Sequence, residues 1–353
     1  MKKVLIVGGG FAGTLIAKKL QKNFNVVLID TKDYFEFTPG ILRSIVEPEH
    51  LKKIQILHST YLKNAQIIKG EVKKVSDKYV FMNGKKLSYD YLVLSSGSRY
   101  NSPIKAQNML LASRTHELKE HSKKLESSNK VLIIGGGLVG VELAAEILEK
   151  FPKKETIIVH SKDRLIERNP KKASKYARDY LTKKGVKIIF NERVVKARKS
   201  SFFTSNNTEI KADIAFFCTG ITPNTEFIKK SFPNSLNERN QVKVNNALQL
   251  ENNKNIFAAG DITSVKEEKT AQNSKKHAAI IIKNILRMNE SKELLPYKPA
   301  PRIMVISLGK YNGILTYKKL MLTGLFPGIL KTIIEKREMF RYKKFMEWFK
   351  DNF

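Results

Sequence analysis

The chain contains a single cysteine, Cys218, among its 353 residues. An intrachain disulfide is therefore impossible, and every reaction that needs a pair of thiols in one chain is excluded. Scarce cysteine is also typical of a reducing compartment. Cys218 lies in the apolar run IAFFCTG, a setting that predicts a small buried core residue rather than a reactive thiol.

Acidic residues are also few, because 33 of them stand against 65 lysines and arginines and leave a net charge of +32. One interpretation is an anionic partner such as nucleic acid, an anionic membrane or a phosphorylated cofactor. The other is a lysine-rich surface that simply faces solvent. Lysine pairs recur in nearly every segment, which favours the second interpretation for most of the charge.

Long apolar runs are missing, since no stretch reaches the roughly 18 residues expected of a membrane-spanning helix. The chain starts with a short apolar strand followed by three glycines, so we expect no signal peptide. Hydrophobic residues make up 42% of the chain, enough to bury real cores. The length predicts about two domains of roughly 150 residues each.

One short glycine-rich motif is present twice, as VLIVGGGFAG and again as VLIIGGGLVG more than a hundred residues later. The first copy comprises a strand at 4–7, Gly8, Gly10, Gly13, a helix at 14–21, a strand at 26–29 and Asp30. Such glycines allow a tight turn, close approach of a pyrophosphate and close packing of helix on strand, and the helix N-terminus attracts phosphate. Asp30 stands about 20 residues on, where an acid binds ribose. The first copy therefore predicts a dinucleotide site.

The second copy repeats the glycines but not the acid. It comprises Gly135, Gly137, Gly140, a helix that carries Glu142, a strand at 156–159, and then His160, Ser161 and Lys162. An acid at the strand end repels a 2′-phosphate, whereas serine and lysine tolerate one. We therefore expect this site to accept NADPH as well as NADH, and the sequence leaves the preference open.

Three more apolar strands end in small residues that bring backbone close to a cofactor. They lead to Ser96 and Gly97, to Gly220, and to Asp261. The expected fold is α/β, with two Rossmann-like dinucleotide-binding domains, for FAD and NAD(P)H, and a small C-terminal region. We expect residues 1–108 and 236–295 to form the FAD domain, 109–235 the NAD(P)H domain and 296–353 the C-terminal region.

These motifs, with GITPNT at 220–225 and AAGD at 258–261, resemble the FAD-dependent pyridine nucleotide oxidoreductase superfamily over roughly residues 1–286. The segment DTKDYFEFTPGILRSIVEP and the His-Ser pair resemble its apoptosis-inducing-factor-like and ferroptosis suppressor branch, close to type II NADH dehydrogenases. The resemblance implies electron transfer from NADH or NADPH through FAD to a quinone, without proton pumping.

The resemblance also assigns residues. It implies FAD contacts for Gly8, Gly10, Gly13, Asp30, Lys32, Arg43, Val72 and Asp261, and NAD(P)H contacts for Gly135, Gly137, Gly140 and Glu142. Lys269 matches a lysine near the flavin ring, and a helix that starts near Thr270 would point its positive end there. Sulfide:quinone and disulfide reductases need two cysteines. Flavin peroxidases place one in the region that reads TPGILRS here, so we expect a diffusing or protein acceptor.

The tail combines an apolar stretch at 320–334 with an aromatic and basic one at 335–353. Apolar and aromatic residues at helical spacing with basic neighbours, among them Phe340, Tyr342, Phe345, Trp348 and Phe349, suit an anionic membrane surface. Docking on the protein's own core and a homodimer contact are the alternatives. The chain begins Met1-Lys2 and lacks the Met-Gly start of acylated relatives.

We therefore expect an NAD(P)H:quinone oxidoreductase, cytoplasmic and peripheral to the cytoplasmic face of a membrane. One alternative is a soluble NAD(P)H-dependent reductase of a small acidic electron carrier. Another is a basic nucleic-acid-binding flavoprotein. The two intact dinucleotide motifs argue against it, because a nucleic-acid-binding protein does not need both. The histidines at 50, 58, 116, 121 and 277 show no metal-like spacing, so we expect no metal.

Overall fold

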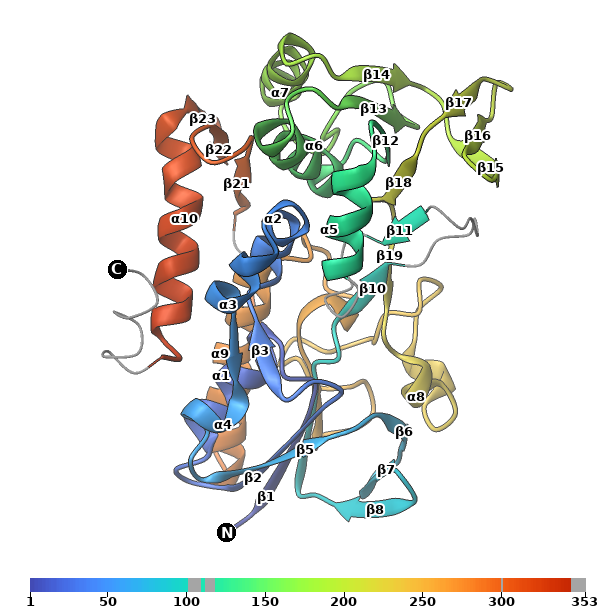
Figure 1. Cartoon of the computed structure of the whole chain (residues 1–353). Helices are drawn as coiled ribbons and strands as arrows, with labels where there is room; N and C mark the ends of the chain where they lie inside the picture. The colour runs from blue at the N-terminus through green and yellow to red at the C-terminus, as the bar shows by residue number, and fades with distance from the viewer. Residues whose placement is uncertain (101–108, 112–117, 300, 344–353) are drawn as a thin grey trace.

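The computed structural model describes residues 1–100, 109–111, 118–299 and 301–343. Two lobes lie one above the other, each built around a five-stranded sheet, and a C-terminal module runs along one side of both (Figure 1). This arrangement confirms the predicted α/β class. The boundaries at 108, 235 and 295 stay predictions.

The lower lobe holds the first glycine motif. Its parallel sheet has the order β20 (Ile256–Ala258), β9 (Tyr91–Leu94), β1 (Lys3–Val7), β2 (Asn25–Asp30) and β5 (Ala65–Lys69). The inner residues of β1, β2 and β9 are apolar and buried because both faces of the sheet are covered there. Helices α1 (Phe11–Leu20) and α9 (Ala271–Asn289) pack against each other on one face. The antiparallel strands β6 (Val72–Val75), β7 (Tyr79–Met82) and β8 (Lys85–Ser88) contribute to the core on the other.

The segment between β2 and β5 is a chain of short elements. They are β3 (Tyr34–Glu36), η1 (Thr38–Gly40), α2 (Ile41–Val46), η2 (Pro48–His50), α3 (Leu51–Ile54), β4 (Gln55–Leu57) and α4 (His58–Tyr61). Helix α2 lies against α6 (Leu138–Lys150) of the upper lobe and against α5 (Leu118–Ser127). This segment therefore connects the two lobes.

The upper lobe repeats the lower. Its parallel sheet has the order β11 (Met109–Leu111), β18 (Ile214–Phe217), β12 (Lys130–Ile134), β13 (Glu155–His160) and β14 (Lys187–Phe190). Helix α7 (Lys171–Lys183) and the antiparallel strands β15 (Val194–Arg198), β16 (Ser201–Thr204) and β17 (Glu209–Lys211) complete it. Strands β10 (Ser98–Tyr100) and β19 (Ile221–Pro223) pair antiparallel where the chain passes between the lobes. Short α8 (Glu226–Lys229), η4 (Pro233–Ser235) and η5 (Gly260–Ile262) follow.

The C-terminal module is an antiparallel sheet followed by a long helix. Strands β21 (Ile303–Ser307), β22 (Gly313–Tyr317) and β23 (Leu320–Gly324) lead into α10 (Leu325–Phe340). The apolar stretch of the tail is thus split at Gly324, whose φ of 96° ends the strand and admits the helix. Pro327 falls in the first turn of α10, where the missing N–H costs nothing.

One tail residue corrects the sequence interpretation. Tyr342 is buried, and its ring centroid lies 4.6 Å from that of Phe35 and 4.8 Å from that of Tyr61. Tyr342 therefore packs on the protein's own core and belongs to no membrane face. Phe345, Trp348 and Phe349 lie outside the described residues. No helix in the described ranges is long and apolar enough to cross a bilayer.

Candidate functional site

The first glycine loop has the geometry that a dinucleotide needs. Gly8 donates its N–H to Ile29 O at 2.8 Å, which fixes the turn between β1 and α1. A Cβ on Gly13 would overlap the carbonyl oxygen of Gly8, whereas a Cβ on Gly10 would meet no atom within 4 Å. The N-terminus of α1 carries no side-chain cap. Open space before uncapped, positively polarised N–H groups fits the pyrophosphate of FAD.

Asp30 is held at the end of β2 beside this loop. Its carboxylate accepts hydrogen bonds from the N–H of Gly9 and, at 2.9 Å, from the N–H of Lys32. Behind it lies the buried imidazole of His58, whose Nδ1 is 2.5 Å from the Tyr61 hydroxyl. Burial lowers the pKa of His58 to about 4. His58 is thus a neutral support of the loop, which the sequence analysis did not identify.

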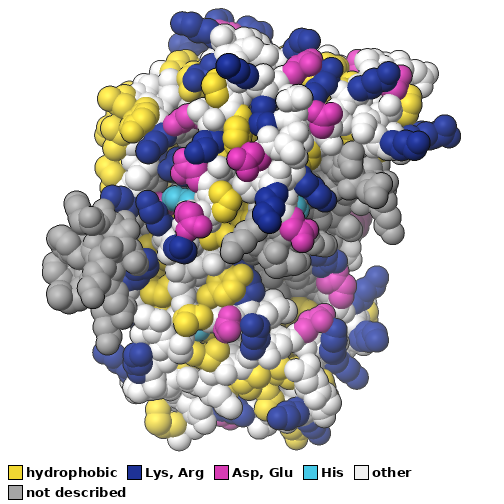
Figure 2. Space-filling view, in the orientation of Figure 1, with side chains coloured by type: hydrophobic (Ala, Val, Ile, Leu, Met, Phe, Trp, Pro, Cys, Tyr) yellow, Lys and Arg dark blue, Asp and Glu magenta, His cyan; other side chains and the backbone are white. Residues whose placement is uncertain are grey.

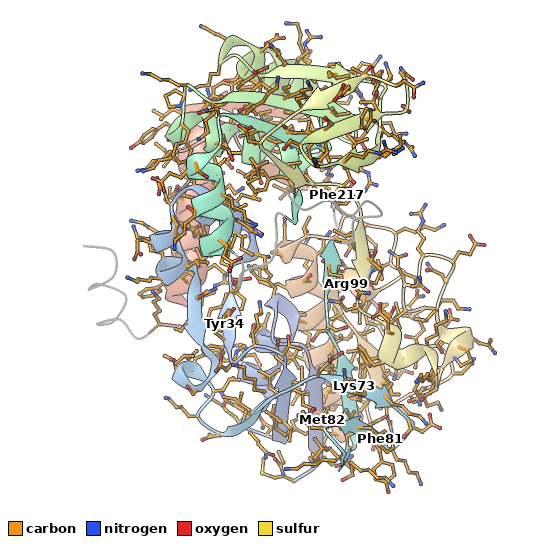
Figure 3. The ribbon with its side chains drawn as sticks, turned by 45° about the vertical axis from the view of Figure 1, so that its right-hand side comes forward. Tyr34, Lys73, Phe81, Met82, Arg99 and Phe217 are labelled. Carbon is orange, nitrogen blue, oxygen red and sulfur yellow. The ribbon has the colours of Figure 1, made fainter. Side chains whose placement is uncertain are left out.

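Lys32 follows the end of β2 by two residues, and Val72 follows the end of the neighbouring strand β5 by three. The Lys32 amine is 3.3 Å from the Glu36 carboxylate and stands over the ring of Tyr34. Val72 is buried on β6 opposite Met82, at the small sheet seen low in Figure 3. The fold thus places both near Asp30's edge of the sheet, and their contact with FAD stays a prediction.

The second loop repeats the first, with an imidazole where the acid stood. A Cβ on Gly140 would overlap the Gly135 carbonyl, and a Cβ on Gly137 would again meet nothing within 4 Å. In the sheet register His160 is the counterpart of Asp30. Its Nδ1 accepts the Gly136 N–H at 3.1 Å, the same bond that Asp30 makes to Gly9.

His160 is therefore no cationic anchor for a phosphate. Burial lowers the pKa of His160, and its Nε2 lies 3.4 Å from the Glu167 carboxylate. A neutral ring that accepts at Nδ1 carries its proton on Nε2. The half-buried Ser161 and the exposed Lys162 follow it. Ser161 and Lys162 are thus the residues at this strand end that could accommodate a 2′-phosphate.

The remaining strand ends converge on the lower sheet. Ser96 Oγ donates to Asn224 O at 2.6 Å, and the Asn224 N–H donates to Gly97 O at 2.9 Å. Ser98 Oγ donates to the Asp261 carboxylate at 2.7 Å. Asn224 follows β19, the strand that leaves Gly220. Figure 3 shows the crossing, with Arg99 below Phe217.

Lys269 and Thr270 stand at the start of α9. Thr270 caps the helix by accepting the Asn273 N–H at 3.2 Å. The Lys269 amine donates to Thr263 O at 2.7 Å and to Val265 O at 3.0 Å, and burial lowers the pKa of Lys269. The helix start predicted near Thr270 is confirmed. The role of Lys269 beside a flavin stays a prediction.

Glu142 joins the upper lobe to the C-terminal module, and Arg43 joins the lower lobe to the upper lobe. Glu142 on α6 accepts from the Ser307 N–H at 2.9 Å and from the ammonium of Lys331 on α10. Arg43 on α2 pairs with Glu146, one turn further along α6, at 3.2 Å. Lys331, Ser307 and Glu146 could not be predicted from the sequence, because no local motif marks them.

A polar crevice lies among these pairs, between α2, α6 and α10. It is lined by Pro39, Gly40, Leu42, Arg43, Glu146, Ser307, Lys331, Thr332 and Glu335. Glu335 also contacts His50, with 3.1 Å between its Oε1 and the ring Nε2. The crevice thus adjoins both the segment expected beside the flavin and the side chains that hold Glu142.

The comparisons with known proteins agree with this geometry. The family model for pyridine nucleotide-disulphide oxidoreductases matches residues 2–278. Apoptosis-inducing factor homolog B of Dictyostelium discoideum is 33% identical to this chain, and the match covers 92% of this chain and 92% of that protein. Ferroptosis suppressor protein 1 of Taeniopygia guttata is 32% identical, covering 96% and 93%. NDH2 of Plasmodium falciparum, solved with NADH, shares the fold with a TM-score of 0.86 at 18% identity, covering 99% and 97%. The resemblance indicated by the motifs is confirmed.

Proposed function

Because the chain belongs to the pyridine nucleotide-disulphide oxidoreductase family, we propose that it is an FAD-dependent NAD(P)H:quinone oxidoreductase that works at a membrane surface. The chemistry that FAD would supply when bound is acceptance of a hydride from NAD(P)H and transfer of two electrons to the acceptor. The first glycine loop, Asp30 and Asp261 would hold FAD. The second loop and Glu142 would hold the nicotinamide dinucleotide, so that the protein's task is placement rather than acid–base chemistry at the hydride.

The acceptor has to come from outside the chain. Cys218 is the one cysteine, and burial raises the pKa of its thiol far above neutrality. The region TPGILRS at 38–44, where a flavin peroxidase would carry its cysteine, has none. No thiol therefore stores the electrons, which supports a diffusible acceptor such as a quinone.

The observation that carries the membrane proposal is the polarity of α10, which turns charged side chains toward the protein and apolar side chains toward solvent. Toward the protein it presents Lys331, Glu335 and Glu338, which pair with Glu142, His50 and Lys275. Toward solvent it exposes Phe326 by 60% and Ile333 by 53%. Soluble helices have the opposite polarity. An apolar outer face is expected where a helix meets an apolar environment.

This outer face continues onto the neighbouring strand. Its exposed apolar residues are Leu320, Leu322, Leu325, Phe326, Ile329, Ile333 and Ile334. Exposed Lys318, Lys319, Lys336 and Arg337 flank them. Figure 2 shows hydrophobic side chains gathered at the upper left edge, over this module. Apolar side chains rimmed by cations suit the interface of an anionic bilayer, where a lipid-soluble quinone dissolves.

The test is flotation with vesicles of phosphatidylcholine containing phosphatidylserine, together with NADH-driven reduction of a long-chain quinone in them. We expect Phe326→Glu with Ile333→Glu to abolish both, while turnover of a water-soluble short-chain quinone is kept. Val195→Glu, at a residue 58% exposed on the upper lobe, is the matched control. A wild-type protein that reduces a small acidic carrier protein but neither binds vesicles nor turns over quinone would overturn the proposal.

A further inference from the structure

Glu335 lines the crevice, and its carboxylate pairs with the imidazole of His50. Glu335 Oε1 and Oε2 lie 3.1 and 3.2 Å from His50 Nε2. Only 7% of the His50 side chain and 12% of the Glu335 side chain are exposed. A Cβ on Gly40 would lie 2.7 Å from Glu335 Oε2. The carboxylate therefore stands directly over the Thr38–Gly40 turn, in the segment expected beside the flavin.

Quinone reduction needs a proton that the nicotinamide does not bring. A quinone that becomes a quinol gains two electrons and two protons, and a hydride carries two electrons and one proton. We infer that Glu335 donates the second proton to the oxygen of a quinone at the mouth of the crevice, whose interior has room for about one water molecule, and that His50 reprotonates Glu335 from solvent. The balance is NAD(P)H plus H⁺ plus quinone giving NAD(P)⁺ plus quinol. The inference rests on the proposed function and deepens it.

The other charged groups that face Glu335 are committed elsewhere. Arg43 on α2 holds Glu146 on α6 at 3.2 Å, and a guanidinium does not release its proton. Lys331, one turn before Glu335 on α10, holds Glu142. Among the described residues that line the crevice, Glu335 thus has the one carboxylate paired with an imidazole. A carboxylate and an imidazole within hydrogen-bond distance can exchange a proton directly.

A purely structural pair is the competing explanation, and the same helix offers its control. Glu338, less than one turn after Glu335, pairs with Lys275 on α9 at 2.7 Å and is 4% exposed. This pair docks α10 on the lower lobe, and Glu338 does not line the crevice. Glu338→Gln therefore removes a buried docking carboxylate without removing a proton donor.

The experiment compares Glu335→Gln, His50→Gln and Glu338→Gln in the FAD-loaded protein. Each is assayed with NADH and either a short-chain ubiquinone or ferricyanide, which takes electrons without protons. We expect Glu335→Gln to lower quinone kcat by about 10²-fold and to leave ferricyanide turnover unchanged. His50→Gln should lower quinone kcat less and alter its pH profile and solvent isotope effect. Glu338→Gln should change neither acceptor selectively.

Two further measurements separate proton delivery from docking, namely thermal unfolding and quinone binding by the oxidised protein. Equal losses with both acceptors in Glu335→Gln, or full quinone turnover in that variant, would overturn the inference while the proposed function stands. A wild-type protein without quinone turnover would overturn both. If Glu335→Gln unfolds at a lower temperature, as expected for Glu338→Gln, but keeps the wild-type ratio of quinone to ferricyanide turnover, then Glu335 only docks α10 and the inference is overturned.

Discussion

Replacing the middle glycine of each loop should separate cofactor binding from folding. Gly10 has φ −80° and ψ −161°, and Gly137 has φ −74° and ψ −169°, extended values that alanine adopts. The new Cβ would meet no protein atom within 4 Å at either site. We therefore expect the cofactor-free protein to keep its unfolding free energy within about 0.5 kcal/mol.

The added methyl group should affect only the binding of the cofactor. If pyrophosphate packs against Gly10, the methyl overpacks that contact at a cost of about 1–3 kcal/mol, or roughly a 5- to 150-fold rise in Kd. Gly10→Ala should weaken the binding of FAD and leave the binding of NADH and NADPH unchanged. Gly137→Ala should keep the protein yellow and raise KM for NADH and NADPH.

The assay is titration of the cofactor-free protein with FAD, followed by quenching of flavin fluorescence, beside urea unfolding without FAD. Gly13→Ala is the contrasting variant, because its Cβ overlaps the Gly8 carbonyl and should destabilise the cofactor-free protein itself. The reasoning is refuted if Gly10→Ala leaves FAD affinity unchanged, or if it destabilises the cofactor-free protein as much as Gly13→Ala does.

Lys331→Met leaves the largely buried Glu142 with Ser307 as its one remaining partner among those described. Urea unfolding should then show a loss of about 1–3 kcal/mol in unfolding free energy, and steady-state kinetics should show a higher KM for NADH. The exposed Lys319→Met is the control and should change neither quantity. Ser161→Glu should reduce kcat/KM for NADPH more than for NADH, and equal effects would remove Ser161 from the ribose site. His58 and His277 have pKa values lowered from 6.5 to about 4, in both by burial first, so the unfolded state binds more protons between these values. Unfolding free energy should therefore fall as pH drops from about 6.5 toward 4, by up to about 3 kcal/mol per imidazole, and a pH-independent value over this range in urea titrations would contradict the burial argument.

The parts of the site that are local in sequence could be predicted from it. In each copy the glycine loop is contiguous in the chain with its strands and its helix, and Asp30 stands about 20 residues after the first loop, so pattern and spacing specify these parts. The exchange of acid for imidazole at His160 was visible in the sequence. Its hydrogen bond to Gly136 was not, because that bond depends on the register of β12 and β13.

The long-range pairs had no such signal. His50 and Glu335 are 285 residues apart, Glu142 and Lys331 are 189 apart, and Thr14 and Tyr342 are 328 apart. Each pair forms only because α10 packs across both lobes. The sequence marked the tail as amphipathic but could not say which face turns inward, so Tyr342 was assigned to the wrong surface.

The most direct test of the central claim is anaerobic stopped-flow spectroscopy of the purified protein. The account predicts flavin absorbance that NADH or NADPH bleaches, and that a short-chain ubiquinone then restores at a rate no slower than steady-state turnover. Bleaching that quinone cannot reverse at that rate would contradict a quinone acceptor, and a protein that binds no flavin would contradict the assignment of the first glycine loop.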